Sequence, residues 1–191
     1  DSKFGGVQIG CITYSFRSMP GSVDDLIKYC VECNISAIEL MGDAVEEYAG
    51  KPKSTMARPA YVPGQPRPQM TDEQRAAMAK LNKEVADWRA SVSMDKFVEV
   101  RKMFNKAGIS IYAFKPNALG PNNTDGEVEY ALKAAKALGA NSVTIELPTD
   151  LEQYQAYNRI APIAEHVEIL AKPFVYAPEM GTKVAEHQGA H

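Results

Sequence analysis

The chain has 191 residues, of which 45% are hydrophobic, and a formal net charge of −3 at pH 7. This composition predicts one globular domain with a substantial core. Its basic residues are not gathered into the clusters that a nucleic-acid surface requires, and no apolar run is long enough to span a membrane. The sequence therefore argues against both kinds of partner.

The chain begins with Asp1 rather than Met, from which we expect that an upstream segment was removed. A cleaved secretory signal fits this start, and so does a cytoplasmic origin, so localisation stays open. Three cysteines, an odd number, argue against a disulfide framework. Cys30 and Cys33 fall inside a helical pattern, which favours core packing over redox or zinc chemistry.

The first elements follow in chain order. Apolar and β-branched residues predict a strand over residues 7–16, which ends in a turn at residues 17–21. Ser22 and Asp25 predict a capped start to a helix that runs to about Cys33. A second strand, residues 35–41, carries Glu39 near its end, and residues 42–43 predict a turn.

Residues 44–93 predict an insertion. Residues 51–70 are rich in proline, which favours an extended surface loop. Thr71 and Gln74 then form a capping box that predicts a helix up to about Arg89. Because the insertion follows the second strand, it is either a lid over a site at that strand end or a surface decoration or oligomer contact.

The remaining pattern alternates helices with strands. Helices are predicted over residues 94–107, 126–138 and 151–165, and strands over residues 109–114 and 142–147. Such alternation requires right-handed crossovers and a parallel sheet, either open and doubly wound or closed as a (β/α) barrel. No glycine-rich dinucleotide-binding motif follows the first strand.

Two of these strands end in the tripeptide Ile-Glu-Leu, at residues 38–40 and 145–147. Strands of a parallel sheet are normally apolar throughout, so a carboxylate near a strand end must be paired, protonated or bound to a ligand. Ligands of α/β folds bind at that end. Glu39 and Glu146 therefore predict a polar site, unless each is held by a basic side chain or a backbone N–H group.

Residues 108–112, 117–120, 122–125, 135–140 and 144–147 resemble the sugar phosphate isomerase/epimerase family, whose members have the xylose isomerase-like TIM barrel. The resemblance covers about residues 7–165. It implies an isomerase or epimerase that acts on a sugar or sugar derivative by proton or hydride transfer next to a carbonyl. It also implies a divalent metal, Mn, Mg, Co or Zn, at the C-terminal rim of the barrel.

The resemblance assigns Glu146 as a metal ligand and a catalytic residue. Glu39, across the same rim, is the second catalytic candidate, as a contact for substrate hydroxyl groups or as a group that orients a neighbour. His187 lies in a segment that faintly resembles the Lys-Val-Ala-x-x-x-His portion of the family, which makes it a second candidate metal ligand. The alternative for His187 is a position in a terminal tail that binds no metal.

Three further residues are candidates for substrate binding. Tyr14 and Phe16 follow the first strand and could form an aromatic wall under a sugar ring, with core packing as the alternative for at least one of them. Lys115 follows the third strand and could steady an anionic or polyol substrate. A solvated lysine is its alternative.

The length of the chain limits the predicted barrel. A TIM barrel takes about 250 residues, and about 140 remain here without the insertion. We therefore expect residues 1–191 to form one partial xylose isomerase-like TIM-barrel domain of about four or five βα units, with residues 44–93 as an insertion or lid. Further sequence or a second copy of the chain, in a homo-oligomer, would cover its sheet edges. Alternative functions are a non-catalytic sugar-binding or structural half-barrel and, more remotely, a metal-dependent phosphodiesterase of the endonuclease IV type.

Overall fold

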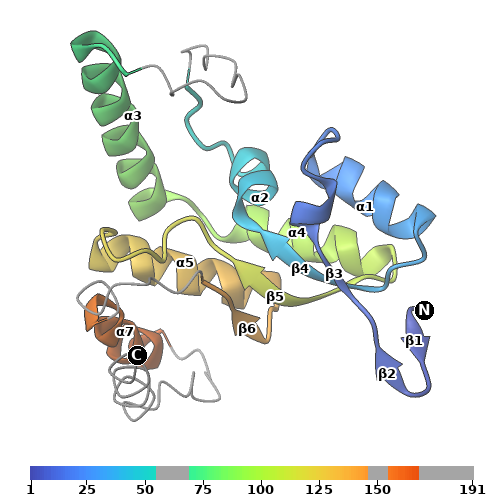
Figure 1. Cartoon of the computed structure of the whole chain (residues 1–191). Coiled ribbons are helices and arrows are strands. Elements are labelled where there is room, and N and C mark those ends of the chain that lie inside the picture. Colours follow the sequence, from blue (N-terminus) through green and yellow to red (C-terminus); the bar gives the residue numbers. More distant parts are fainter. Residues whose placement is uncertain (55–68, 146–154, 168–191) are drawn as a thin grey trace, which may run out of the picture.

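A computed structural model of the chain describes residues 1–54, 69–145 and 155–167. These residues form a mixed α/β fold around a parallel sheet of four strands, in the order β3-β4-β5-β6 (Figure 1). The strands are Cys11–Ile12 (β3), Ala37–Met41 (β4), Ser110–Lys115 (β5) and Ser142–Val143 (β6). The predicted parallel α/β architecture is confirmed at this level.

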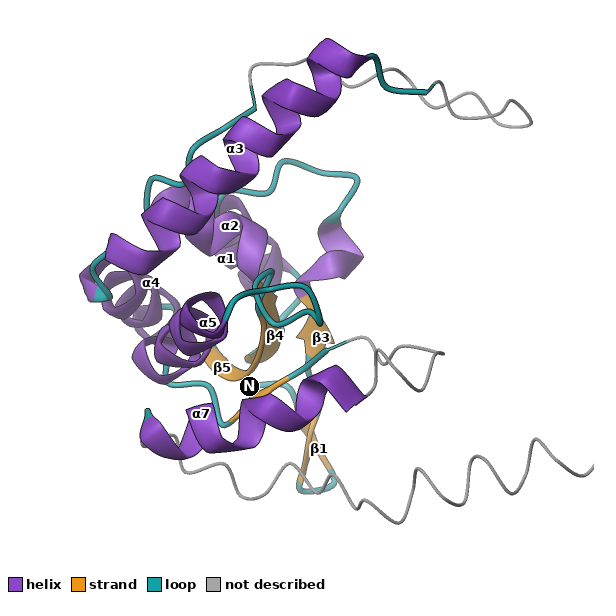
Figure 2. Ribbon diagram, turned by 90° about the vertical axis from the view of Figure 1, so that its left-hand side faces the viewer, coloured by secondary structure: helices purple, strands orange, loops and turns teal. Residues whose placement is uncertain are grey.

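Helices cover one side of these strands. Figure 2 shows α1, α4 and α5 together on one side of the sheet, while α3 extends away from the body and α7 lies beside α5. No helix in the described part of the chain combines the length and apolar character needed to cross a membrane. The helices are Val23–Glu32 (α1), Gly42–Tyr48 (α2), Asp72–Ser91 (α3), Asp95–Lys106 (α4), Asp125–Leu138 (α5), Ala156–Arg159 (η2) and Ile160–His166 (α7).

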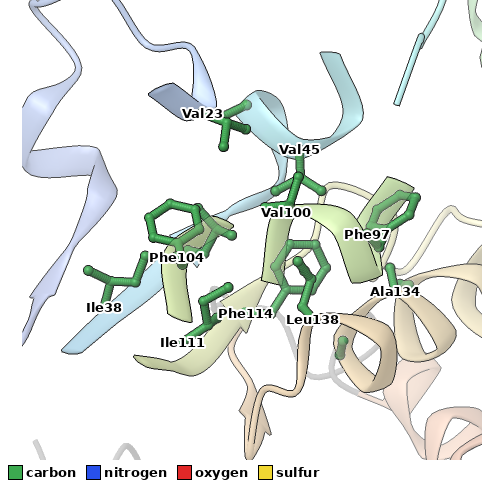
Figure 3. Close-up of a cluster of buried hydrophobic side chains, with 14 of the residues drawn as sticks. Val23, Ile38, Val45, Phe97, Val100, Phe104, Ile111, Phe114, Ala134 and Leu138 are labelled. Atoms are coloured by element: carbon green, nitrogen blue, oxygen red, sulfur yellow. The ribbon is translucent and has the colours of Figure 1, made fainter. Parts of the chain in front are cut away.

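The hydrophobic core lies between the sheet and this helix layer (Figure 3). Ile38 and Leu40 of β4 and Ile111 and Phe114 of β5 belong to it. Each large side chain that is fully buried contributes about 1.5–3 kcal/mol relative to an exposed one. Because side chains alternate along a strand, the residues between these core positions face the other side of the sheet. The helices contribute Val23, Leu26, Phe97, Val100, Phe104, Val128, Leu132 and Leu138, among others.

Reciprocal capping boxes start three of the helices, as the sequence predicts for two of them. In each case the N-cap hydroxyl accepts a hydrogen bond from a backbone N–H group and the third helical residue binds back to the N-cap. These bonds fix the starts of α1, α3 and α5, and the predicted helices there are confirmed. The pairs are Ser22 with Asp25, Thr71 with Gln74, and Thr124 with Glu127.

The expected first strand over residues 7–16 is wrong. Val7–Gln8 (β2) pairs with Lys3–Phe4 (β1) in an antiparallel hairpin, only Cys11–Ile12 joins the parallel sheet, and Thr13–Phe16 forms a 3₁₀ helix, η1. The hairpin turns at Gly5 and Gly6, whose φ values are 56° and 82°. A Gly-Gly pair is a known hairpin signal, but the β-branched run after it points equally well to one long strand.

The expected turn at residues 42–43 is also wrong, because α2 begins directly after β4. The residues that follow Gly42 are good helix formers, including Ala44 and Glu46. A Cβ atom on Gly42 would lie 3.1 Å from the side-chain nitrogen of Asn117. Glycine therefore allows the segment after β5 to approach the start of α2.

Two glycines of α5 should respond in opposite ways to the same substitution. Gly139 ends the helix with φ 71°, whereas Gly126 in the first turn has nothing within 4 Å of an added Cβ atom. We expect Gly139→Ala to lower the free energy of unfolding by about 1–2 kcal/mol. Gly126→Ala should raise it by about 0.5 kcal/mol. Urea unfolding followed by circular dichroism measures both, and an equal loss of stability in the two variants would contradict the assigned helix end.

Candidate functional site

The sheet face opposite α1, α4 and α5 carries the candidate site. Ile38, Leu40 and Phe114 point into the core, so their neighbours along β4 and β5 point to this other face. We call it the Glu39 face. The strand register and the alternation of side chains place its residues in three rows that run across the strands. The row nearest the N-terminal ends of the strands holds Gly10, Ala37 and Tyr112. The middle row holds Ile12, Glu39 and Ala113, and the row nearest the C-terminal ends holds Met41, Lys115 and Thr144.

Glu39 makes a hydrogen bond across the sheet. The Thr144 hydroxyl donates to Oε1 of Glu39 at 2.5 Å. Ala113 of β5 lies in register with Glu39, and its small side chain leaves room for the two groups to meet. Within the described residues, Oε2 of Glu39 has no hydrogen-bond partner. Glu39 is thus a half-buried carboxylate that one donor orients and that can still accept a hydrogen bond from a ligand.

Tyr112 lies on the same face, at a β-bulge of β5. Ile38 pairs with Ile111 and Glu39 pairs with Ala113, so Tyr112 is an extra residue opposite β4. Its ring lies against the backbone of Gly10, where an added Cβ atom would be 2.8 Å from Cε1 of the tyrosine. Burial, and then the negative charge of Glu39, raise the pKa of Tyr112. Its hydroxyl group therefore stays protonated at neutral pH.

The candidates for substrate binding are separated in space. Lys115 lies on the Glu39 face, one row nearer to the C-terminal edge than Glu39. Phe16 packs on Tyr29 of α1 with ring centroids 5.3 Å apart, beside the core, which is the alternative that the sequence left open for one of the two aromatic residues. Tyr14 is 51% exposed, with the guanidinium group of Arg17 4.6 Å from its ring centroid. A sugar contact by Tyr14 stays a prediction.

The predicted metal ligands Glu146 and His187 lie outside the described residues, as do residues 55–68 of the expected lid. Among the residues that the structure describes, no three His, Cys, Asp or Glu side chains gather where they could hold a metal ion. Glu39 and Thr144 alone supply fewer oxygen ligands than Mn²⁺ or Mg²⁺ requires. The described residues therefore do not fit a complete metal site, and metal binding stays a prediction that depends on Glu146 and His187.

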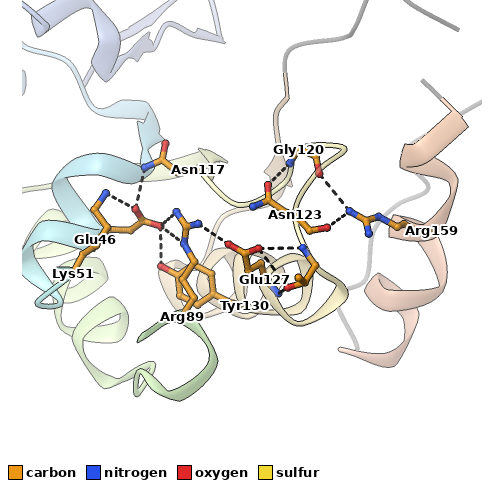
Figure 4. Close-up of polar contacts among 10 residues, drawn as sticks. Glu46, Lys51, Arg89, Asn117, Gly120, Asn123, Glu127, Tyr130 and Arg159 are labelled. Atoms are coloured by element: carbon orange, nitrogen blue, oxygen red, sulfur yellow. Dashed lines mark hydrogen bonds and ion pairs between the residues drawn. The ribbon is translucent and has the colours of Figure 1, made fainter. Parts of the chain in front are cut away.

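A second polar cluster is centred on Glu46 of α2, the helix that directly follows β4 (Figure 4). The side chain of Glu46 is only 1% exposed. Nε and Nη2 of Arg89 on α3 donate to its Oε1 at 3.2 and 3.0 Å, and the Tyr130 hydroxyl lies 3.3 Å from the same oxygen. Lys51 and Asn117 donate to Oε2 at 2.7 and 3.1 Å. We call these five residues the Glu46 cluster.

The Glu46 cluster joins the insertion to the sheet. Arg89 also binds Glu127 at 2.9 Å, so one guanidinium group links α2, α3 and α5. Asn117 follows β5 directly and also donates to Asp43 at 2.9 Å. Because Asn117 lies two residues after Lys115, the cluster fixes the chain where it leaves the Glu39 face.

Glu127 balances the charge of the Glu46 cluster, because the two carboxylates of Glu46 and Glu127 then face the two cations Arg89 and Lys51. Burial alone would raise the pKa of Glu46, but the attraction of Arg89 and the hydrogen bonds from Lys51 and Asn117 outweigh it, and the pKa is lowered. The pKa of Glu127 is lowered against its burial by hydrogen bonds from Thr124, Asn123 and Arg89. No buried side-chain nitrogen or oxygen in the described part of the chain lacks a partner. The cluster is therefore charged, satisfied and suited to positioning rather than to proton transfer.

Arg159 of η2 holds the loop between β5 and α5 from the other side (Figure 4). Its Nη2 atom donates to the carbonyl oxygens of Gly120, Pro121 and Asn123, and Nη1 pairs with Asp125 at 3.1 Å. The loop thus has fixed partners on both flanks.

Sequence reasoning missed the Glu46 cluster and Tyr112. Glu46 lies just after residues 42–43, for which the sequence predicted a turn, and its partner Arg89 lies on a different helix far along the chain. Tyr112 occupies a position in an apolar strand where no local signal marks a bulge. The available hint was Arg89 next to Trp88 on α3, since both side chains contact Tyr130.

Comparisons of this chain with protein-family models, with curated proteins and with solved structures found no match. Its function is therefore inferred from its own residues and their arrangement.

The Glu46 cluster predicts a large loss of stability on removal of Arg89. Arg89→Met leaves the buried Glu46 without its main counter-charge, and we expect a loss of about 3–5 kcal/mol in the free energy of unfolding. Arg75→Met on the same helix removes an exposed pair with Asp72 and an exposed hydrogen bond to the carbonyl oxygen of Met70, and it should change the free energy of unfolding by less than about 0.5 kcal/mol. Urea unfolding measures both. Similar values for the two variants would show that the cluster does not hold α3.

The lowered pKa of Glu46 also predicts how stability depends on pH. A carboxyl group whose pKa is lower in the folded state contributes stability above its ordinary pKa of 4.5 and loses it as the pH falls through the folded value. We expect unfolding free energies to be level near neutral pH and to fall below about pH 4.5. The fall should be shallower in Glu46→Gln, because unfolding then takes up fewer protons. The same slope in both proteins would contradict the lowered pKa.

Proposed function

We propose that the chain is a divalent-metal-dependent isomerase or epimerase for a sugar or sugar derivative, built as part of a xylose isomerase-like TIM barrel. The hydrogen bond between Glu39 and Thr144 carries the proposal. It orients a strand carboxylate on the sheet face away from the helices, near the strand ends where (β/α) barrels bind ligands. In the described part of the chain the helices that pack on the sheet lie on one face (Figure 2), which adds support, since doubly wound sheets have helices on both faces.

Glu39 suits the chemistry of such an enzyme. A carboxylate can take a proton from the carbon next to a carbonyl group, or accept hydrogen bonds from sugar hydroxyl groups. Strand β4 and the Thr144 hydroxyl fix the direction of Glu39, and Oε2 is left for the substrate. Lys115, in the next row, is placed to bind an anionic or hydroxyl group of the same substrate. Among the described residues of this face, Glu39 supplies one carboxylate, which is too few to hold a metal ion. A metal at this rim would therefore need Glu146 and His187 as further ligands.

A non-catalytic sugar-binding or structural half-barrel is the second candidate. It is favoured by the absence of a three-ligand metal group among the described residues. In this case a second copy of the chain would cover the edges of the sheet.

Turnover in D₂O separates the two candidates. We expect the chain to bind Mn²⁺ in calorimetry and to convert aldoses to ketoses, or to epimerise ketoses, with deuterium entering next to the carbonyl if a proton is transferred. Glu39→Gln and Glu146→Gln should each lower kcat/KM by about 10²-fold or more, as loss of a general base does. Glu32→Gln, at an exposed position of α1, is the matched control and should retain activity. If the chain binds sugar but converts none with Mn²⁺, Mg²⁺, Co²⁺ or Zn²⁺ added, the result would favour the non-catalytic candidate.

A further inference from the structure

Tyr112 lies at an irregularity of β5 that gives the Glu39 face two successive residues of this strand, Tyr112 and Ala113. Ile111 faces the helices, so regular alternation would place Tyr112 on the Glu39 face and Ala113 on the helix side. The bulge instead puts Ala113 in register with Glu39 and leaves Tyr112 as an extra residue on the same face. Bulges of this kind re-aim a side chain and occur beside active sites.

The ring of Tyr112 has support on one side and exposure on the other. Gly10, just before β3, has no side chain, so the ring edge occupies the space that a Cβ atom there would need. The side chain is nevertheless 39% exposed, and its hydroxyl group has no hydrogen bond to a described residue. An aromatic ring that is held along one edge and exposed elsewhere is a preformed apolar surface.

Polar groups stand beside this apolar surface. Glu39 lies in the next row of the face, and Thr144 holds it there at 2.5 Å. A pyranose or cyclic polyol has the matching pattern: C–H groups on the faces of the ring and hydroxyl groups around its rim. Sites that bind small ligands combine aromatic walls with a few fixed polar groups in this way.

We infer that Tyr112 is a stacking surface for one face of a sugar or cyclic polyol ring, whose hydroxyl groups bind Glu39 and Thr144. This inference rests on the proposed sugar site, but it does not require catalysis. It adds a positioning residue and defines the substrate as one that presents an apolar ring face.

The test uses D-xylose and methyl β-D-xylopyranoside, because the second sugar is locked as a ring and cannot be isomerised. Saturation-transfer NMR on the full chain should show transfer from the protein to the ring C–H protons of both sugars. Titration should give Tyr112→Phe a dissociation constant close to that of the original protein, because the ring remains. Tyr112→Ala should weaken binding by about tenfold. Phe4→Ala removes an exposed aromatic residue in the N-terminal hairpin and is the matched control, with unchanged binding expected.

The outcomes separate this inference from the proposed reaction. Binding of the locked sugar that depends on Tyr112, without any turnover, would support the stacking surface and contradict the isomerase. Turnover with equal KM in the original protein and in Tyr112→Ala would support the isomerase and contradict the stacking surface. If Tyr112→Ala does not fold, Tyr112→Leu, which keeps an apolar side chain of intermediate size, should still bind more weakly than Tyr112→Phe. Failure of both sugars to bind, or equal binding by Tyr112→Leu and Tyr112→Phe, would overturn the inference.

Discussion

The buried carboxylate of Glu46 is the constraint on which the arrangement of this chain depends. Removal of a carboxylate from water costs several kcal/mol, which must be offset by charges and donors in good geometry. Those groups come from α3, α5 and the segments that follow α2 and β5, so none of these parts can be placed independently of Glu46 on α2. Helix α3 has no fully buried residue, and its position depends on Arg89 together with the contact of Trp88 with Tyr130.

Strand β5 connects the Glu46 cluster to the Glu39 face. Just after its C-terminal end, Asn117 donates hydrogen bonds to Glu46 and Asp43, which fixes the point where the chain leaves the sheet. In its middle, the bulge at Tyr112 changes which side chains reach the Glu39 face. The small side chain of Ala113 then allows Glu39 to reach Thr144 past β5. Rigid support at one end of the strand and irregularity in its middle together determine the chemistry that this face presents.

Local patterns in the sequence were sufficient for most helices. A hydroxyl residue followed three positions later by Asp or Gln marked the starts of α1 and α3, and apolar spacing marked the strands that carry Glu39 and Tyr112. These signals work because each depends on neighbours within one turn. The Glu46–Arg89 pair and the bulge depend on residues that meet only after folding, so no window of sequence contains them. The position of Glu39 on the face away from the helices follows from strand alternation, whereas its bond to Thr144 does not.

Gly10 and Tyr112 occupy one shared volume, although they lie on different strands. A methyl group on residue 10 would lie 2.7 Å from the carbonyl oxygen of Ala37 and 2.8 Å from the tyrosine ring. The first contact is with backbone and can be relieved only by a shift of β4, while the second requires the ring to move or to be lost. A side chain at position 10 is therefore compatible with this sheet only when position 112 is also changed. In the evolution of this chain, position 112 could therefore change first, whereas a side chain at position 10 would have to follow such a change and would still require β4 to shift.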